Sequence, residues 1–276
     1  MKVELINPHG FCAGVKGALD KAHALALSHK KVYCLHEIVH NEIVVADLCR
    51  KGFVFVESLD DVPEGETVLF SAHGVSPQVR QQALKRQLKV VDATCPFVTR
   101  VHKAARRYYE ADMPVVIIGK GSHAEVKGII GEAPEAFVIS DISQARAFEL
   151  PQNFNGKIGV VSQTTMNSDE VAKIVEELCA RYQVETSAEV CNATKERQEA
   201  VKAFAGDAVL VLGSQNSSNT RRLCEVAACK TFRAANIEEV RAIDFSGIKR
   251  LGVTSGASTP EKFYDEAVEF LLSYMS

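Results

Sequence analysis

Three cysteines of this 276-residue chain lie where a β-prone run gives way to a helical pattern. Cys12 follows the alternating run from Val3 to Ile6, and Cys95 and Cys191 follow β-prone runs of their own. A helix N-terminus favours the thiolate form of a cysteine, which is the form that binds metals. One such cysteine is equally well explained as a packing residue in a tight turn, but three equivalent junctions indicate a common metal centre.

Composition narrows the class of protein. A hydrophobic content of 46% and a charged content of 24% are typical of an ordinary globular protein. The net charge is -3 without a long basic run, so nucleic acid is not expected as a partner. Neither a membrane span nor a signal peptide is present in the pattern, which predicts a cytoplasmic protein. Eight cysteines in such a protein indicate packing, metal binding or catalysis rather than disulfides.

The predicted elements form an α/β unit that is repeated three times along the chain. Each unit opens with a helix after a cysteine and closes with a strand that leads to the next cysteine. The third unit lacks its closing strand, so we expect the run from Val3 to Ile6 to complete it. The units are therefore predicted at 13–94, 95–190, and 191–276 together with 1–12. Alternating strands and helices predict parallel sheets whose functional loops lie at the carboxyl ends of the strands.

Local signals fix several helix boundaries. Ser76 followed by Pro77 is typical of an N-cap and first helical residue, and Ser168 is expected to cap a helix of its own. A helix from Glu42 to Arg50 is expected to end at Gly52.

Three thiolates without an equivalent fourth ligand are typical of an iron–sulfur cluster with one open iron. Zinc remains an alternative, although catalytic zinc usually has mixed ligands. A C-x-x-C pair is absent from the sequence, which disfavours a zinc ribbon or finger. The other cysteines are expected to be core or simple surface residues: Cys34, Cys49, Cys179, Cys224 and Cys229.

The loops after the strands carry histidines, hydroxyls and amides, which together with helix N-termini suit a phosphate or diphosphate. Glu125 is the carboxylate in these loops that is placed for proton donation, and Thr164 could relay protons to it. Alternatively, Glu125 is a first-turn glutamate that the helix dipole stabilises. Isolated histidines, such as His102, are expected to be solvated. The candidate binding residues are His40, His73, His123, Thr165, Ser217, Ser218, Asn219 and Ser258.

Short motifs that contain these residues occur throughout the chain. The motifs are Gly10-Phe11-Cys12-Ala13-Gly14-Val15, Val39-His40-Asn41, Ser71-Ala72-His73-Gly74-Val75, Asp92-Ala93-Thr94-Cys95-Pro96, His123-Ala124-Glu125-Val126, Gln163-Thr164-Thr165, Cys191-Asn192-Ala193-Thr194, Asn216-Ser217-Ser218-Asn219 and Gly256-Ala257-Ser258. Together they resemble those of the 4-hydroxy-3-methylbut-2-enyl diphosphate reductase family. The resemblance implies a trefoil of three α/β domains around a [4Fe-4S] cluster, with Cys12, Cys95 and Cys191 as ligands.

The family reaction removes the substrate hydroxyl as water with two electrons and two protons, and gives isopentenyl or dimethylallyl diphosphate. The resemblance implies that the hydroxyl binds the unique iron, that Glu125 supplies protons and that Thr164 holds the hydroxyl, with His123 as a further catalytic residue. A ferredoxin or flavodoxin is implied as electron donor. The implied diphosphate ligands are His40, His73, His123, Ser217, Ser218, Asn219 and Ser258, with Thr165 and Thr194 as second choices.

Two positions depart from the family pattern, and other functions compete. His9 stands where the family often has arginine, and Ala124 stands where it often has proline. The competing functions are a dehydratase of the quinolinate synthase type, a zinc hydrolase, and a non-catalytic sensor of redox state or iron. A sensor has no need for a polar pocket, so the polar loops favour an enzyme.

Overall fold

The computed structural model describes residues 1–151, 154 and 156–273. The strands in this part of the chain form three four-stranded sheets, and every pair of neighbouring strands is parallel. Two compact units hold these sheets: one comprises residues 1–16, 39–51 and 192 onward, and the other residues 17–38 and 52–191. The expected fold class, α/β with three parallel sheets, is confirmed.

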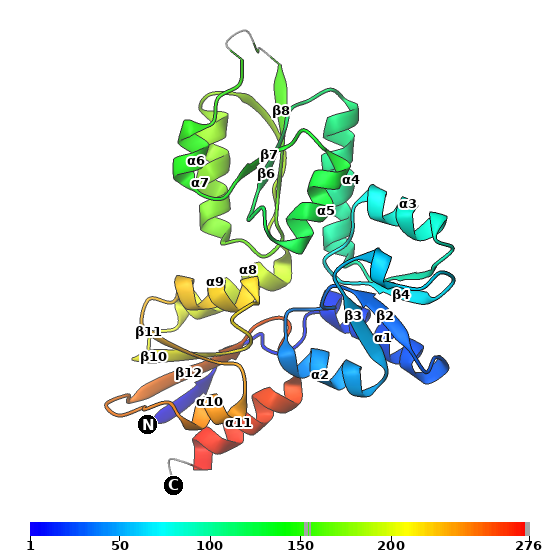
Figure 1. Ribbon diagram of the computed structural model, residues 1–276. Coiled ribbons are helices and arrows are strands. Elements are labelled where there is room, and N and C mark those ends of the chain that lie inside the picture. Colours follow the sequence, from blue (N-terminus) through cyan, green and yellow to red (C-terminus); the bar gives the residue numbers. More distant parts are fainter. Residues whose placement is uncertain (152–153, 155, 274–276) are drawn as a thin grey trace. The chain divides into compact units, whose positions relative to one another are not determined.

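The sheet of the first unit has the strand order β1-β12-β10-β11 (Figure 1). β1 pairs in parallel with β12, so the strand at the start of the chain joins the sheet of the C-terminal part, as predicted. The strands are β1 (Lys2–Leu5), β10 (Ala208–Leu212), β11 (Lys230–Ala234) and β12 (Arg250–Ser255). The helices of this unit are α2 (Glu42–Arg50), α8 (Asn192–Ala203), α9 (Ser218–Val226), α10 (Ile237–Arg241) and α11 (Glu261–Ser273).

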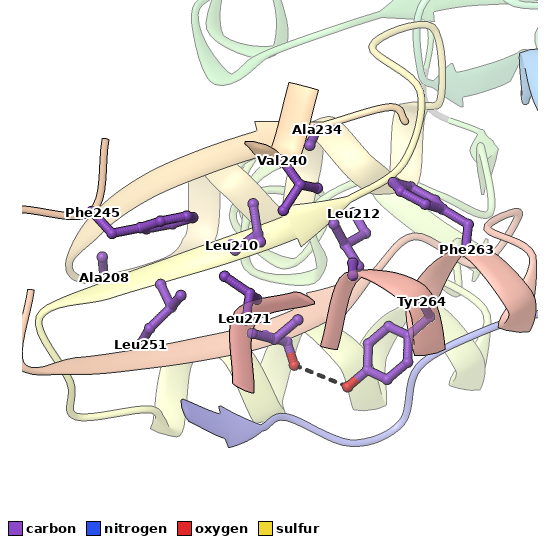
Figure 2. Packing of buried hydrophobic residues seen from close by; sticks show 12 residues of the cluster. Ala208, Leu210, Leu212, Ala234, Val240, Phe245, Leu251, Phe263, Tyr264 and Leu271 are labelled. Atoms are coloured by element: carbon purple, nitrogen blue, oxygen red, sulfur yellow. Dashed lines mark hydrogen bonds between the residues drawn. The ribbon is translucent and has the colours of Figure 1, made fainter. Parts of the chain in front are cut away.

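Helices cover both faces of this sheet. On one face, Leu210 and Leu212 of β10 pack with Phe263 and Leu271 of α11 (Figure 2). On the other face, alternate residues of β10 pack with α8 and α9. The run Ala208–Leu212 is buried at every position, which explains its unbroken apolar sequence.

The second unit contains a sheet with the order β3-β2-β4-β5. Its strands are β2 (Val32–Leu35), β3 (Phe53–Val56), β4 (Thr67–Phe70) and β5 (Lys89–Asp92). The nearby helical segments are α1 (Ala13–Ser28), which begins directly after Cys12, the short 3-10 helix η1 (Leu59–Asp61) and α3 (Pro77–Lys85). Ser76 caps α3 and Pro77 is its first residue, as predicted.

The other sheet of the second unit has the order β7-β6-β8-β9. Helices α4 and α5 cover one face, and α6 and α7 cover the other (Figure 1). The strands are β6 (Val115–Ile118), β7 (Phe137–Ile139), β8 (Lys157–Ser162) and β9 (Gln183–Ser187). The helices are α4 (Pro96–Glu110), α5 (Ala124–Glu132), α6 (Ile142–Ala147) and α7 (Ser168–Cys179).

One predicted cap is wrong by a single residue. Asn167, not Ser168, caps α7, and its side-chain oxygen accepts hydrogen bonds from the backbone N–H groups of Asp169 and Glu170. Asparagine is as good an N-cap as serine, so the sequence Asn167-Ser168 offers two candidates that pattern alone does not separate.

Helix α5 packs closely against the loop that follows β4. A Cβ atom added to Gly131 would lie 2.1 Å from the Cβ of Ser76, and one added to Gly128 would lie 2.9 Å from Cε1 of His102. His102, expected to be solvated, is instead buried, and its Nδ1 lies 3.1 Å from Oε1 of Glu132. The missing side chain of Gly131 thus lets α5 approach the β4 loop, which carries His73, while Gly128 and the His102–Glu132 pair bring α5 against α4.

Among the described residues, no helix is both long enough and apolar enough to cross a bilayer.

Candidate functional site

The three junction cysteines are held by the same backbone contact. Cys12, Cys95 and Cys191 directly precede α1, α4 and α8, and each partly exposes its side chain. The backbone N–H of each cysteine donates a hydrogen bond to the carbonyl of a residue that lies two positions after the end of a strand, namely β12, β4 or β8. The acceptors are the carbonyls of Ala257, Ala72 and Thr164, at 3.1, 3.0 and 3.1 Å respectively. The repeated pattern thus places each cysteine in the same way.

Cys12 lies at the N-terminus of α1. Its Sγ accepts a hydrogen bond from the backbone N–H of Val15 at 3.5 Å, and its carbonyl accepts from Lys16 at 2.9 Å. The sulfur therefore lies at the positive end of α1, where a negative charge is stabilised. The three partly exposed cysteines Cys12, Cys95 and Cys191 match the sulfur donor set of an iron–sulfur cluster.

Other cysteines are less suited to metal binding. Burial raises the pKa of the Cys34 thiol to about 12 and that of Cys224 to about 11. A thiol with so high a pKa stays protonated near neutral pH. Cys49 and Cys179 are exposed on the surfaces of α2 and α7.

Glu125 and Thr164 form a buried acid–hydroxyl pair. Glu125 is 2% exposed, and Thr164 donates to it twice: from the backbone N–H to Oε1 at 2.7 Å and from the hydroxyl to Oε2 at 3.1 Å. Burial raises the pKa of Glu125 to about 7, although the two bonds from Thr164 act in the opposite direction. The carboxyl group is therefore partly protonated near neutral pH, as a proton donor requires.

His123 is held in a defined tautomer. It caps α5, and its Nδ1 accepts a hydrogen bond from the backbone N–H of Glu125 at 3.2 Å. Since Nδ1 accepts, the proton of the neutral ring lies on Nε2, which is then a donor for an anion. The His73 ring lies 5.5 Å from the His123 ring at 87°, and the Ser71 hydroxyl lies 3.3 Å from Nδ1 of His73.

The first unit holds further hydroxyl and amide groups at helix starts. Ser217 caps α9, and its hydroxyl accepts from the backbone N–H of Thr220 at 3.3 Å. Ser218 and Asn219 lie in the first turn of α9 and are buried. Within the described residues, neither Oδ1 nor Nδ2 of Asn219 has a hydrogen-bond partner. A buried amide of this kind is paired in most proteins, so it points to a polar ligand.

His40 and the start of α9 are linked through contacts in the same unit. The Ser258 hydroxyl donates to the carbonyl of His40 at 3.3 Å. The Ser214 hydroxyl, just before α9, donates to Oε1 of Glu42 at 2.7 Å. Polar groups at two helix N-termini are thereby fixed in the loops that carry the predicted binding residues.

Comparison with known proteins decides the family. The model of the family described as "LytB protein" matches residues 3–272. The chain belongs to this family. It is 43% identical over 283 residues to the 4-hydroxy-3-methylbut-2-enyl diphosphate reductase of Rhodopirellula baltica, covering 98% of this chain and 88% of that protein. It is 42% identical over 280 residues to the reductase of Acidothermus cellulolyticus, covering 98% and 82%.

Solved structures of reductases also match the fold of this LytB protein. The E-1-hydroxy-2-methyl-but-2-enyl-4-diphosphate reductase from Plasmodium falciparum superposes with a TM-score of 0.91 at 33% identity, covering 98% of this chain and 87% of that one. A structure of (E)-4-hydroxy-3-methyl-but-2-enyl diphosphate reductase matches with a TM-score of 0.68 at 32% identity, covering 99% and 100%.

The LytB chain brings several predicted residues into direct contact. Glu125 contacts Thr164, and His123 lies beside His73, all within the second unit. In the first unit, Ser258 contacts the His40 backbone, and Ser217 to Asn219 form the start of α9. Thr194 is buried in the first turn of α8, close in sequence to Cys191.

Sequence reasoning missed one buried link in the second unit. Gln163 is fully buried; its Nε2 donates to Oγ1 of Thr165 at 2.9 Å, and its Oε1 accepts from the backbone N–H of Lys120 at 3.1 Å. It thereby joins the loop after β8 to the loop after β6. Its position could have indicated this role, because Gln163 directly follows a buried strand and precedes Thr164 and Thr165, which were predicted as site residues.

Proposed function

We propose that this chain reduces (E)-4-hydroxy-3-methylbut-2-enyl diphosphate to isopentenyl and dimethylallyl diphosphate, which is the last step of the methylerythritol phosphate pathway. The substrate C–O bond to the hydroxyl breaks, and two electrons and two protons give the dehydroxylated diphosphate product and one water. Family membership supports the reaction class. The observation that carries the proposal is the buried Glu125–Thr164 pair, with the pKa of its carboxyl group raised to about 7.

Cys12, Cys95 and Cys191 are proposed to hold a [4Fe-4S] cluster, and the units 13–94, 95–190 and 191–276 with 1–12 are proposed as three repeats that each supply one ligand. The cluster, when bound, supplies the electrons and an open iron for the substrate hydroxyl. The equivalent hydrogen bonds from the backbone N–H groups of the three cysteines to loop carbonyls support this assignment. A ferredoxin or flavodoxin is the proposed electron donor.

Proton delivery is assigned to Glu125 and Thr164. With Glu125 ionised, the Thr164 hydroxyl donates to Oε2, and its oxygen lone pairs can accept from the substrate hydroxyl. When Glu125 is protonated on Oε2, this hydrogen bond reverses: the carboxylic O–H donates to the Thr164 oxygen, and the Thr164 O–H donates to the leaving oxygen. A proton shift along this chain, from Glu125 through Thr164, then lets the leaving oxygen depart as water. Burial keeps the pKa of Glu125 near neutral, so the acid can be reprotonated for each turnover.

Diphosphate binding is assigned to groups that donate hydrogen bonds. The fixed tautomer gives His123 an Nε2–H donor, and the unsatisfied amide of Asn219 gives another donor at the start of α9. Helix N-termini add backbone N–H groups and a favourable dipole. The full proposed set is His40, His73, His123, Thr165, Thr194, Ser217, Ser218, Asn219 and Ser258.

The test uses protein purified without oxygen, with iron and sulfide counted per chain. Substrate-dependent oxidation of reduced methyl viologen is expected for the natural protein, and about a hundredfold less for Glu125→Gln with iron content unchanged. Glu132→Gln is the matched control, because Glu132 is a buried glutamate on the same helix whose carboxylate faces His102 and Arg106 instead.

Glu132→Gln should oxidise the dye at the rate of the natural protein at temperatures where the variant is folded. A full cluster without dye oxidation in the natural protein would contradict the reductase and favour a dehydratase. Bound zinc in place of iron would contradict the cluster.

A further inference from the structure

Arg197 joins helix α8 to the loop that leads to Cys12. Arg197 is 3% exposed and lies six residues after Cys191 in the sequence. One terminal nitrogen of its guanidinium donates to the carbonyl of Ala193 at 2.9 Å. The other donates to the carbonyls of Gly10 at 2.9 Å and His9 at 3.5 Å. The two terminal nitrogens of the planar guanidinium therefore bond to α8 and to the loop before Cys12 at the same time. The single ammonium group of a lysine is less suited to such a double contact.

The backbone of Gly10 is held through its N–H group as well as through its carbonyl. Its N–H donates to the hydroxyl of Ser255 at 2.7 Å, and Ser255 is fully buried at the end of β12. Two residues further on, the N–H of Cys12 donates to the carbonyl of Ala257. Arg197 and the residues at the end of β12 thus form hydrogen bonds to one short segment, residues 9–12, which ends at Cys12.

The loop before Cys95 is stabilised differently, by a local turn contact. Before Cys95, Asp92 accepts hydrogen bonds from both the backbone N–H and the hydroxyl of Thr94, so that loop is stabilised within three residues. Gly10 has no side chain, and its φ of +70° lies in the left-handed region. The Cys12 loop therefore depends on partners that are distant in sequence.

We propose that Arg197 is a positioning residue for Cys12: it fixes the Gly10 peptide so that the sulfur stays at the start of α1. Charge-assisted hydrogen bonds in a buried setting are strong enough to hold such a loop closed. The loop part of this inference stands alone, whereas its consequence for the cluster rests on the proposed function.

The loop is tested on reduced protein without a cluster, by hydrogen exchange with mass-spectrometric readout. In Arg197→Met, the segment from residues 7 to 12 should exchange about tenfold faster, equivalent to about 1.4 kcal/mol of lost protection. Arg197→Lys should give an intermediate rate, because one donor is restored. Arg181→Met is the matched control: Arg181 also donates to backbone carbonyls, those of Ala145, Arg146 and Phe148, far along the chain from Cys12.

The control should leave the 7–12 segment unchanged. Unchanged exchange in Arg197→Met, or equal acceleration at the Cys95 loop, would overturn the proposal. If Arg197→Met does not fold, Ser255→Ala removes only the acceptor of the Gly10 N–H and should accelerate exchange in the same segment. Unchanged exchange there would equally overturn it.

The cluster consequence is tested on protein reconstituted with iron and sulfide. Iron release to a ferrous chelator should be about tenfold faster in Arg197→Met than in the natural protein or in Arg181→Met. Faster exchange of the loop with unchanged iron release would refute the role of Arg197 toward the cluster, while its role in the loop would stand. Failure of the natural protein to bind iron would refute the proposed function, and the exchange result would be unaffected.

Discussion

Replacing Glu125 with glutamine should stabilise the protein, and more so as the pH rises. Burial raises the pKa of this carboxyl group from 4.5 to about 7 in the folded state. The folded protein therefore binds the proton more tightly than the unfolded chain does. The stability that comes from protonated Glu125 is fully present below the unfolded pKa of 4.5 and is lost as the pH rises through about 7.

The size of the effect follows from the shift. A rise of about 2.5 pKa units at about 1.4 kcal/mol per unit gives a cost of about 3 kcal/mol once the folded group is ionised. Between about pH 5.5 and about pH 8.5 the cost should grow by about 2 kcal/mol. Glutamine can keep both contacts with Thr164, because its Oε1 accepts from the Thr164 N–H and its Nε2 donates to the Thr164 hydroxyl.

The assay compares the melting temperatures of cluster-free natural protein and Glu125→Gln across this pH range. Ionisations at other sites are common to both proteins and cancel in the difference. The difference should widen in favour of the variant by about 4 °C or more at the alkaline end. A constant difference across the range would refute the raised pKa, and a variant that becomes relatively less stable at high pH would reverse the sign of the argument.

Three further perturbations have defined outcomes. Gly159→Ala should lower stability by about 3 kcal/mol in chemical denaturation, because the new Cβ would lie 2.3 Å from Cγ of the buried Tyr108; natural-like stability would refute the contact. Glu132→Ala should cost about 2 kcal/mol, since it leaves buried His102 without its carboxylate, and the melting temperature checks this. Asn219→Ala should raise KM about tenfold while the cluster-free protein melts no lower, because the amide removed is buried and unpaired among the described residues; an unchanged KM would contradict ligand binding there.

Much of the fold could be predicted because its signals are local. Ser76-Pro77 marks the start of α3, and this boundary was predicted correctly from two adjacent residues. That β1 joins the sheet of the C-terminal part rests on a long-range contact, yet the completion of the third unit by the first strand was predicted as well. That success came from counting repeats, since the third unit lacked one strand that only the start of the chain could supply.

The sequence was less informative about side chains of the site whose burial determines their contacts or their pKa. His102 was expected to be solvated, but Glu132 lies thirty residues away in sequence and meets it inside the protein. For Glu125, position alone favoured a simple first-turn glutamate. Its raised pKa depends on the approach of Thr164 and on complete burial, which are properties of packing between segments distant in sequence.

Thr164 contacts both Cys191, which we propose as a cluster ligand, and Glu125, which we propose as the acid. Its carbonyl accepts the N–H of Cys191, while its own N–H and hydroxyl both bind Glu125. The equivalent carbonyls at the other two cysteines belong to alanines, which have no hydroxyl to offer. Three repeats therefore share the contact that places the cysteine, and a single residue in one of them adds the contact that places the acid. Repetition accounts for the three junction cysteines that we propose as ligands, and the proposed proton donor lies where the repetition is broken.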